Sequence, residues 1–198
     1  MAARRAQIVA LASGSGSTLQ AILDDPELGP LVVAAGTDRP DCTAMTRAEA
    51  AGVPTFARAL RDYPDRAAWN AGLAEAIASY EPDLVVLAGF MRLLAPEVVR
   101  RFRIVNTHPA LSPAFPGAHA IRDALAAGAT ETGVTVHWVD EGVDTGPIIV
   151  QQAVPVLPDD DEESLRTRIQ AAEKPLYVQA IRRLCTAAEP INTVENTR

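Results

Sequence analysis

The segment Leu84-Val85-Val86-Leu87-Ala88 decides the fold that this sequence predicts. All of its side chains are apolar, so both faces of the extended segment are expected to be buried, as in the central strands of parallel sheets. Parallel neighbours need long crossover connections, and helix-like patterns flank the segment on both sides. The segment therefore predicts an open sheet with helices packed on its faces.

Outward from this segment, strand-like and helix-like patterns alternate through the first half of the chain. The expected strands lie at residues 7–12, 31–36, 53–56 and 104–107, and the expected helices at residues 17–25, 65–80 and 95–101, with another that ends near residue 51. The strand at 53–56 is expected at an edge, because Pro54 has no N–H to donate to a central ladder. This alternation predicts right-handed crossovers and an α/β, doubly wound, mostly parallel sheet.

The pattern changes after Gly117. A helix at residues 119–127 precedes strands at 132–139 and 148–156, and the short loop between these strands predicts an antiparallel C-terminal strand pair. The alternation within residues 132–139 predicts that one face of that strand is wetter than the other. A last helix is expected at residues 160–184, where Pro175 should kink or interrupt it.

Length and composition bound the class of protein. A chain of 198 residues can bury one sizeable core, so we expect residues 1–186 to form a single domain and the polar residues 187–198 to form a disordered tail. The net charge of −7 argues against nucleic acid as a partner. No apolar run is long enough to span a membrane. Cys42 and Cys185 lack the spacing of metal ligands, which favours a reduced cytoplasmic protein without a metal.

The motif Asn106-Thr107-His108-Pro109 holds the first candidate catalytic residues. Side chains two apart on a strand point to the same side, so Asn106 and His108 should both project beyond the carboxyl end of the strand, where open α/β sheets bind ligands. Pro109 restricts the backbone of His108, and we expect His108 to line a cleft rather than the core. An amide donor beside an imidazole suits a reaction that builds charge on a carbonyl oxygen and moves protons.

A second candidate element is the acidic loop Asp140-Glu141-Gly142-Val143-Asp144-Thr145-Gly146-Pro147. It lies between the two C-terminal strands, and Gly142 and Gly146 bracket Asp144. The loop is therefore placed where Asp144 could return to meet His108. A carboxylate within contact distance of His108 would favour the protonated form of its imidazole.

The segment Ser13-Gly14-Ser15-Gly16-Ser17-Thr18 follows the first strand and opens a helix. Backbone N–H groups and the helix dipole can hold a phosphate in that geometry. The segment is neither a dinucleotide fingerprint, because Leu19 stands where the last glycine would be, nor a P-loop. A merely permissive turn is the alternative, and the local residues leave the two interpretations open.

For three other features, the neighbouring residues alone do not indicate a functional role. Met91, Leu93 and Leu94 follow the central strand and could line an apolar pocket, although the local pattern favours a core. Glu173 and Lys174 beside Pro175 could face a cleft, although a solvated pair is the simpler interpretation. No catalytic role is assigned to His119 or His137, which fit surface or strand positions.

Together these motifs resemble one family, the phosphoribosylglycinamide formyltransferases, which are the folate-dependent glycinamide ribonucleotide transformylases of purine synthesis. The matching segments run in order from about residue 7 to 184, and they are Ser13-Gly14-Ser15-Gly16-Ser17, residues 85–92, Asn106-Thr107-His108-Pro109, Phe115-Pro116-Gly117 and Val143-Asp144-Thr145-Gly146-Pro147. The resemblance implies that residues 1–186 form a formyltransferase catalytic domain. The chain departs from the usual family pattern at Thr18, Ala110 and Ser112.

The resemblance also implies site residues, carried over position by position. The catalytic trio falls on Asn106, His108 and Asp144. The contacts to glycinamide ribonucleotide fall on Gly16, Ser17, Thr18, Gln170, Ala171, Ala172 and Glu173. The contacts to the folate fall on Arg66, Met91, Arg92, Leu93, Leu94, Asn106, Asp140, Glu141, Gly142, Val143 and Asp144.

The chemistry that the resemblance implies agrees with the residues. The amine of glycinamide ribonucleotide attacks the formyl carbon of 10-formyltetrahydrofolate, which is a co-substrate, and neither a metal nor a covalent enzyme intermediate is required. Asn106 would donate to the oxyanion, His108 would act as general acid, and Asp144 would stabilise the imidazolium. The implied partners are these small molecules, without nucleic acid or membrane, and a homodimer stays open.

Two rival functions remain from the sequence. Another formyl-folate enzyme, such as the formyltetrahydrofolate deformylase or methionyl-tRNA formyltransferase, could share the Asn-x-His and Asp pattern. Those enzymes typically carry an additional domain, which we do not expect in a chain of 198 residues. The other rival is a nucleotide-binding sensor, which would not need Asn106, His108 and Asp144.

Overall fold

The computed structural model describes residues 5–186, and the sequence-predicted tail at 187–198 lies outside the described residues. Across the described range, seven strands form one sheet in the order β3-β2-β1-β4-β5-β6-β7. The strands are β1 (Ile8–Leu11), β2 (Val32–Thr37), β3 (Thr55–Ala57), β4 (Leu84–Leu87), β5 (Ile104–His108), β6 (Glu131–Trp138) and β7 (Ile148–Pro155). The helices are α1 (Ser17–Leu23), α2 (Thr43–Ala50), α3 (Arg66–Ala78), α4 (Pro96–Arg101), α5 (Ala120–Ala126) and α6 (Glu162–Thr186), with short 3₁₀ turns η1 (Gly29–Leu31) and η2 (Leu60–Asp62).

The chain divides into two compact units, Met1–Val105 and Asn106–Arg198, and the boundary falls within β5. The predicted fold class, an α/β mostly parallel sheet with an antiparallel C-terminal strand pair, is confirmed. The prediction that residues 1–186 act as one catalytic domain stays a prediction.

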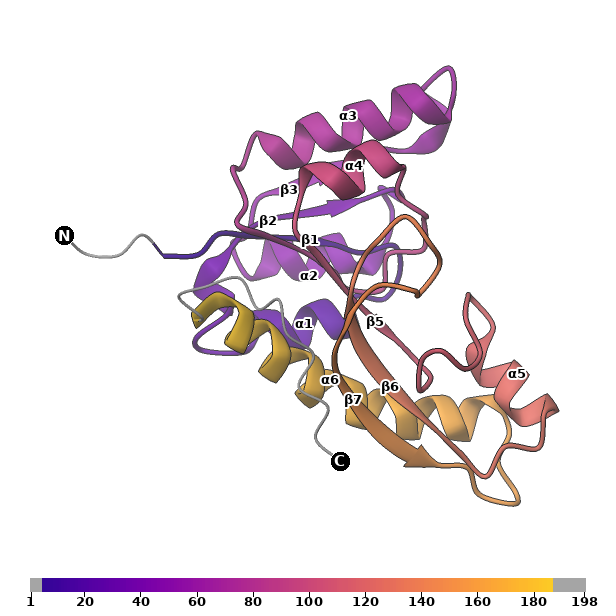
Figure 1. The fold of residues 1–198 in the computed structure, drawn as a ribbon. Helices are drawn as coiled ribbons and strands as arrows, with labels where there is room; N and C mark the ends of the chain where they lie inside the picture. Colours follow the sequence, from indigo (N-terminus) through magenta and orange to yellow (C-terminus); the bar gives the residue numbers. More distant parts are fainter. Residues whose placement is uncertain (1–4, 187–198) are drawn as a thin grey trace. The chain divides into compact units, whose positions relative to one another are not determined.

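The first unit is built on parallel strands with helices on both faces. The strand β1 pairs in parallel with β2 on one side and with β4 on the other, and β2 pairs in parallel with β3. All four residues of β4 are buried, as its uniformly apolar sequence predicts. Figure 1 shows α3 and α4 on one face of these strands and α1 and α2 on the other. The strand β3 is the edge, as Pro54 predicts.

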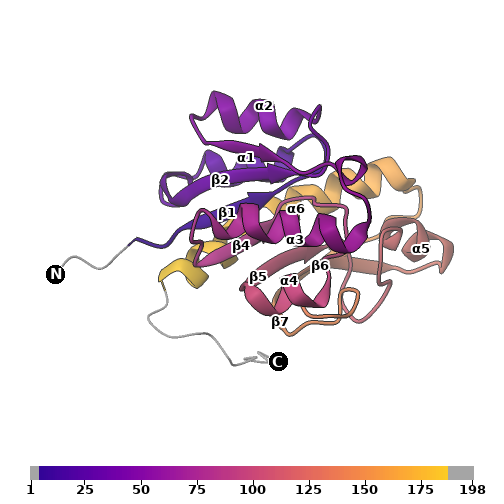
Figure 2. The same cartoon turned by 90° about the horizontal axis from the view of Figure 1, so that it is seen from above.

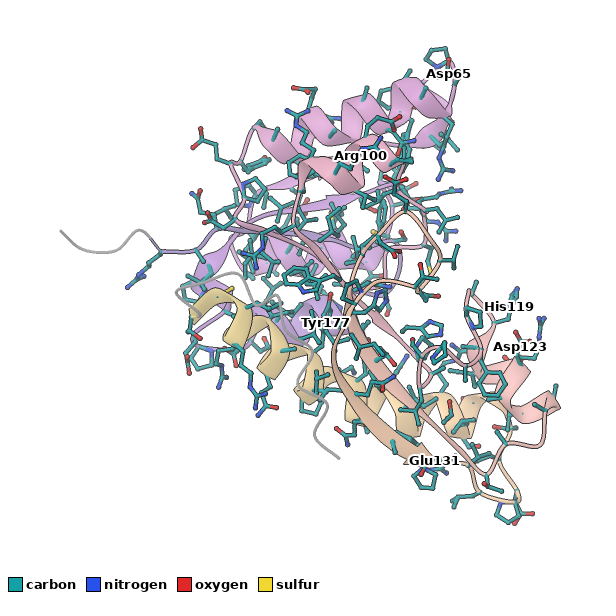
Figure 3. The ribbon with its side chains drawn as sticks, in the orientation of Figure 1. Asp65, Arg100, His119, Asp123, Glu131 and Tyr177 are labelled. Carbon is teal, nitrogen blue, oxygen red and sulfur yellow. The ribbon has the colours of Figure 1, made fainter. Side chains whose placement is uncertain are left out.

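Helix α3 shows how the sequence specifies a helix of this unit. It begins after Asp65, whose carboxylate accepts a hydrogen bond from the amide of Ala68 at 2.8 Å (Figure 3). Trp69, Leu73 and Ile77 recur every fourth residue and are fully buried. The Trp69 indole N–H donates to the carbonyl of Arg58, which satisfies the polar atom of this large core side chain.

The second unit contains an antiparallel pair covered by a long helix. The strands β6 and β7 pair in antiparallel register, and α6 packs against both of them (Figures 1 and 2). Helix α6 continues through Pro175, so the predicted interruption is wrong, and the alternative of a kink at Pro175 stays a prediction. Proline removes only one helical hydrogen bond, and buried side chains on both sides of it, including Ile169 and Tyr177, keep the helix packed.

The prediction of a wetter face on β6 is also wrong. Six of its eight residues are buried. The Thr135 hydroxyl donates to the carbonyl of Ala110 at 2.6 Å, whereas the buried hydroxyl of Thr132 has no hydrogen-bond partner among the described residues. Alternation of polar residues indicates a solvated face only when water is their partner. Here the outer strand β7 carries the exposed residues.

A substitution at Gly36 tests the packing of the first unit. A Cβ at Gly36 would overlap the Phe56 ring and the Leu11 side chain. Gly36→Ala is therefore expected to lower the free energy of unfolding by about 1–3 kcal/mol, measured by chemical denaturation. The matched control is Gly14→Ala, because a Cβ at Gly14 meets no atom within 4 Å. Equal losses of stability in the two variants would contradict this account of the packing.

Candidate active site

The end of β5 presents Asn106 and His108 on the same side of the strand, as predicted. The expectation that His108 lines a cleft is wrong for this structure, because the residue is only 3% exposed. Two segments cover the imidazole. Its Nε2 lies 2.8 Å from the carbonyl oxygen of Phe115, and its Nδ1 lies 3.2 Å from Oδ2 of Asp144.

These two contacts and burial act on His108 in opposite directions. Burial lowers the pKa of His108, whereas the charge of Asp144 and the carbonyl of Phe115 raise it, and a nearby His137 lowers it again. The net pKa lies below the ordinary value for histidine, so the ring is mostly neutral at pH 7. Both ring nitrogens face oxygen acceptors, so only the protonated ring can donate to both.

Asp144 is placed by an unusual backbone conformation. Its φ is +54°, in the left-handed region that Asp tolerates better than most residues. Its Oδ2 accepts a hydrogen bond from the amide of Gly117 at 2.8 Å as well as facing His108. Burial raises the pKa of this carboxyl, but His137, the Gly117 amide and His108 together outweigh it, and the net pKa is lowered. Asp144 is therefore ionised at neutral pH.

His137 belongs to this cluster, although no role was assigned to it from the sequence. It is 2% exposed, and its Nε2 lies 3.6 Å from Oδ1 of Asp144 and 3.4 Å from the side-chain amide nitrogen of Asn106. Its Nδ1 lies 2.9 Å from the carbonyl oxygen of Trp138. If Nδ1 donates to that carbonyl, the neutral ring can accept from Asn106 and orient its amide. The available signal was a histidine near the end of a strand, just before the acidic loop.

By contrast, His119 lies exposed at the start of α5, near Asp123, as Figure 3 shows. Its surface position agrees with the expectation for this residue. His119 is therefore useful as an internal reference for measurements on the buried histidines.

The loop that carries Phe115 is held by backbone contacts. Thr135 Oγ1 accepts from the amide of Ser112 at 3.0 Å and from the side-chain amide of Gln151 at 2.8 Å, and it donates to the carbonyl of Ala110. These contacts use main-chain atoms of Ala110 and Ser112, so the departures from the family pattern at both positions leave them available. Thr135 thus supports the loop whose carbonyl faces His108.

The acidic loop closes on the side chain of Asp140. Its Oδ1 accepts from the amide of Gly142 at 3.0 Å and from the hydroxyl of Thr145 at 2.7 Å. Gly146 packs against the carbonyl of Trp138 so closely that a Cβ there would overlap it. The predicted folate residues Glu141, Gly142 and Val143 are exposed at the tip of this loop.

In the first unit, the predicted phosphate loop has a geometry that glycine permits. Gly16 has φ +72° and precedes α1 with no side-chain cap, and a Cβ there would overlap Ala44. Ser17 and Thr18 begin the helix and are partly exposed. Arg47, which sequence reasoning did not single out, donates from Nε to the carbonyl of Ser15 at 2.9 Å. The loop is therefore supported by α2.

The predicted folate residues of the first unit come together in space. The guanidinium of Arg66 donates to the carbonyl of Leu93 at 2.5 Å and lies 4.9 Å from the ring centre of Trp69. Met91 and Leu93 are 69% and 64% exposed, so the interpretation of these residues as core is wrong. Arg92 and Leu94 are partly buried. An exposed apolar loop beside an arginine offers a surface for a flat ligand with an anionic group.

The remaining predicted residues lie on α6 in the second unit. Gln170 and Glu173 are one helical turn apart and partly buried, as is Ala172, whereas Ala171 is exposed. Glu173 therefore does not stand alone as a fully solvated residue. Ala171 is the member of this set whose side chain the structure turns most toward solvent.

The described residues offer neither a metal centre nor a membrane-spanning helix. Within residues 5–186, no group of three or more His, Cys, Asp or Glu side chains is arranged to hold a metal ion. None of the helices in that part of the chain combines the length and apolar character needed to cross a membrane. The expectation that the reaction needs no metal stays a prediction.

Known proteins are similar to this chain in sequence and in fold. A family model described as formyl transferase matches residues 6–181. The chain is 52% identical over 185 residues to phosphoribosylglycinamide formyltransferase of Mycobacterium tuberculosis, covering 91% of this chain and 86% of that protein. It is 40% identical over 175 residues to the Escherichia coli protein of the same name, covering 86% and 82% of the two chains.

A solved structure is similarly close. Glycinamide ribonucleotide transformylase 1 from Symbiobacterium toebii superposes with a TM-score of 0.88 at 47% identity, covering 91% of this chain and 88% of that one. The agreement extends the confirmed fold class to a formyltransferase fold.

The charge coupling between Asp144 and His108 can be tested directly. Asp144→Asn keeps the shape of the side chain but removes the charge that raises the pKa of His108. The pKa of His108 is then expected to fall further, by about 1–3 units, in an NMR titration. Because the protonated fraction falls as pH rises, kcat/KM should drop more at pH 8 than at pH 6.

The exposed His119 serves as the internal reference in the same spectra. An unchanged pKa of His108 in the Asp144→Asn variant would show that Asp144 only shapes its loop.

Proposed function

We propose a residue-level mechanism from the premise that this chain belongs to the formyl transferase family and, within it, to the phosphoribosylglycinamide formyltransferases. The enzyme transfers a formyl group to the amine of 5'-phosphoribosylglycinamide in purine biosynthesis. The family uses 10-formyltetrahydrofolate as co-substrate. The observation that carries the mechanism is the cluster of the buried His108 and His137 with the partly buried Asn106 and Asp144.

The reaction needs an oxyanion donor, and Asn106 suits that role. As the substrate amine forms its bond to the formyl carbon, negative charge develops on the formyl oxygen. One hydrogen of the Asn106 amide can remain on His137, at 3.4 Å, while the other donates to that oxygen. A preoriented donor of this kind is worth about 10²–10³ in rate.

His108 and Asp144 would assist the transfer of a proton from the attacking amine to N10 of the folate. The neutral, buried imidazole gains a proton more readily when negative charge develops beside it, because an opposite charge raises its pKa. The attacking amine loses one proton, and N10 of the folate receives one as its bond to the formyl carbon breaks. Asp144 stabilises the imidazolium between these steps through the contact at 3.2 Å.

The binding residues follow the family pattern. We assign the substrate phosphate to Gly16, Ser17 and Thr18, and further contacts of the ribonucleotide to residues 170–173. The exposed side chains of Met91 and Leu93 suit the flat rings of the folate, and the exposed Arg66 suits an anionic group. Arg92, Leu94 and residues 140–144 complete the proposed folate contacts.

The cellular setting is also a proposal. An acidic enzyme of purine biosynthesis is expected to work in the cytoplasm on small molecules, without nucleic acid, membrane or metal.

His108 gives the most direct test of the mechanism. His108→Ala is expected to lower kcat by about 10²–10⁴-fold, the usual contribution of general acid catalysis. Turnover is followed by the absorbance of the formyl-folate donor, with and without glycinamide ribonucleotide. Because His108 is buried, circular dichroism and thermal unfolding must show that the variant is folded.

His119→Ala is the matched control. Because His119 is exposed, this variant should turn over substrate at close to the wild-type rate. A folded His108→Ala enzyme with more than about a tenth of the wild-type kcat would contradict the assigned role. Consumption of the donor by the wild type without the amine would indicate a deformylase instead.

The phosphate assignment predicts a difference between two ligands. Calorimetry should show that glycinamide ribonucleotide binds at least about tenfold more tightly than its unphosphorylated riboside, as loss of charge-assisted hydrogen bonds implies. Gly16→Ala should reduce that preference, because Gly16 has a positive φ and no room for a Cβ. Equal affinities of the wild type for both ligands would rule out this phosphate site.

A further inference from the structure

Three loops of the first unit meet at one buried carboxylate. Ser13 follows β1, Asp38 follows β2, and Met91 and Arg92 follow β4. These strands are neighbours in the order β2-β1-β4 and run parallel, so their carboxyl ends share one edge of the sheet. The side chain of Asp38 has no exposed surface.

Asp38 connects these loops through a chain of hydrogen bonds. The amide of Met91 donates to Ser13 Oγ at 2.9 Å, and the Ser13 hydroxyl donates to Oδ1 of Asp38 at 2.5 Å. On the other oxygen, Nε of Arg92 donates to Oδ2 of Asp38 at 2.7 Å. Two consecutive residues of one loop are thus bound, directly or through Ser13, to a single carboxylate.

The contacts explain why the loop after β4 keeps apolar side chains in water. Exposing Met91 and Leu93 is unfavourable, and an unrestrained loop would be expected to bury them. The hydrogen bonds made by the Met91 amide and by the Arg92 side chain restrain two consecutive residues of this loop. A buried ion pair seldom adds much stability over apolar packing. We therefore attribute the pair of Arg92 and Asp38 to the conformation of the loop that it fixes.

We propose that Asp38 is a positioning residue for the folate co-substrate. It holds residues 91–94 in the conformation that binds the folate. Through Ser13, Asp38 also connects that loop to the segment Ser13–Thr18, which contains the assigned phosphate contacts at Gly16–Thr18. The inference rests on the proposed function, because it takes the assigned roles of these two loops as given.

A consequence is that the two binding loops of the first unit are coupled. A ligand that orders one loop would favour the conformation of the other through Ser13 and Asp38. Reciprocity requires that the phosphate ligand and the folate ligand then change each other's affinity by the same factor.

Asp38→Asn tests the positioning role. The new amide has a single acceptor oxygen, so it can accept from Ser13 or from Arg92 but not from both, and the charge that pairs with Arg92 is lost. We expect the KM for formyl-folate to rise at least about tenfold, within the usual range of couplings, while kcat changes less than about threefold. Hydrogen exchange of the Met91 amide should become faster.

The control is Asp160→Asn, which removes another buried carboxylate paired with an arginine. Asp160 is 3% exposed in its side chain and accepts from Arg168 at 2.8 Å, outside the assigned folate residues. It should leave the KM for formyl-folate unchanged. If Asp38→Asn fails to fold, Ser13→Ala replaces it, because it breaks the link from Met91 to Asp38 and should raise the same KM.

The coupling is measured by calorimetry of tetrahydrofolate with and without saturating glycinamide ribonucleotide. The wild type and Asp160→Asn should show a shift in affinity that Asp38→Asn or Ser13→Ala loses. An unchanged KM for formyl-folate and an unchanged shift in the folded variant would overturn the positioning role. Failure of the proposed function is distinguishable, because the wild type itself would then show no formyl transfer.

Discussion

Partial burial of the Asp144 carboxylate beside two buried imidazoles is the constraint on which the second unit depends. A charge that is removed from water must find polar partners, and here the Gly117 amide donates to the carboxylate while the rings of His108 and His137 lie 3.2 and 3.6 Å from it. Those partners come from β5, β6 and the loop that follows β5. Satisfying one carboxylate therefore fixes three segments, and it leaves a neutral imidazole within 3.2 Å of a permanent negative charge.

The first unit uses the same physical device for a different purpose. Asp38 is a buried carboxylate, and its donors likewise come from neighbouring strand ends. There the partners include a hydroxyl and an arginine rather than imidazoles, so the cluster orders loops instead of moving protons. In both units, apolar packing builds the sheet, whereas directional polar contacts determine the conformation of the loops beyond it.

Sequence reasoning failed where burial depended on distant parts of the chain. The alternation in β6 suggested a wet face, but Thr135 finds its partners in Ala110, Ser112 and Gln151. His137 was passed over for the same reason, since only pairing within the sheet brings it to Asn106. Met91 and Leu93 looked like core residues because their side chains are apolar, yet hydrogen bonds at distant Ser13 and Asp38 hold their loop outward.

The sequence by itself determined the order and type of the elements, the parallel sheet, its edge strand and the placement of Asn106 and His108 at the end of β5. These follow from side-chain periodicity and from proline, which act within a few residues. Only the tertiary structure decided which polar groups meet: Asp144 with Gly117, His137 with Asn106, Asp38 with Arg92. Such contacts join residues far apart in the chain, and their distances and burial set the charges, which no local pattern encodes.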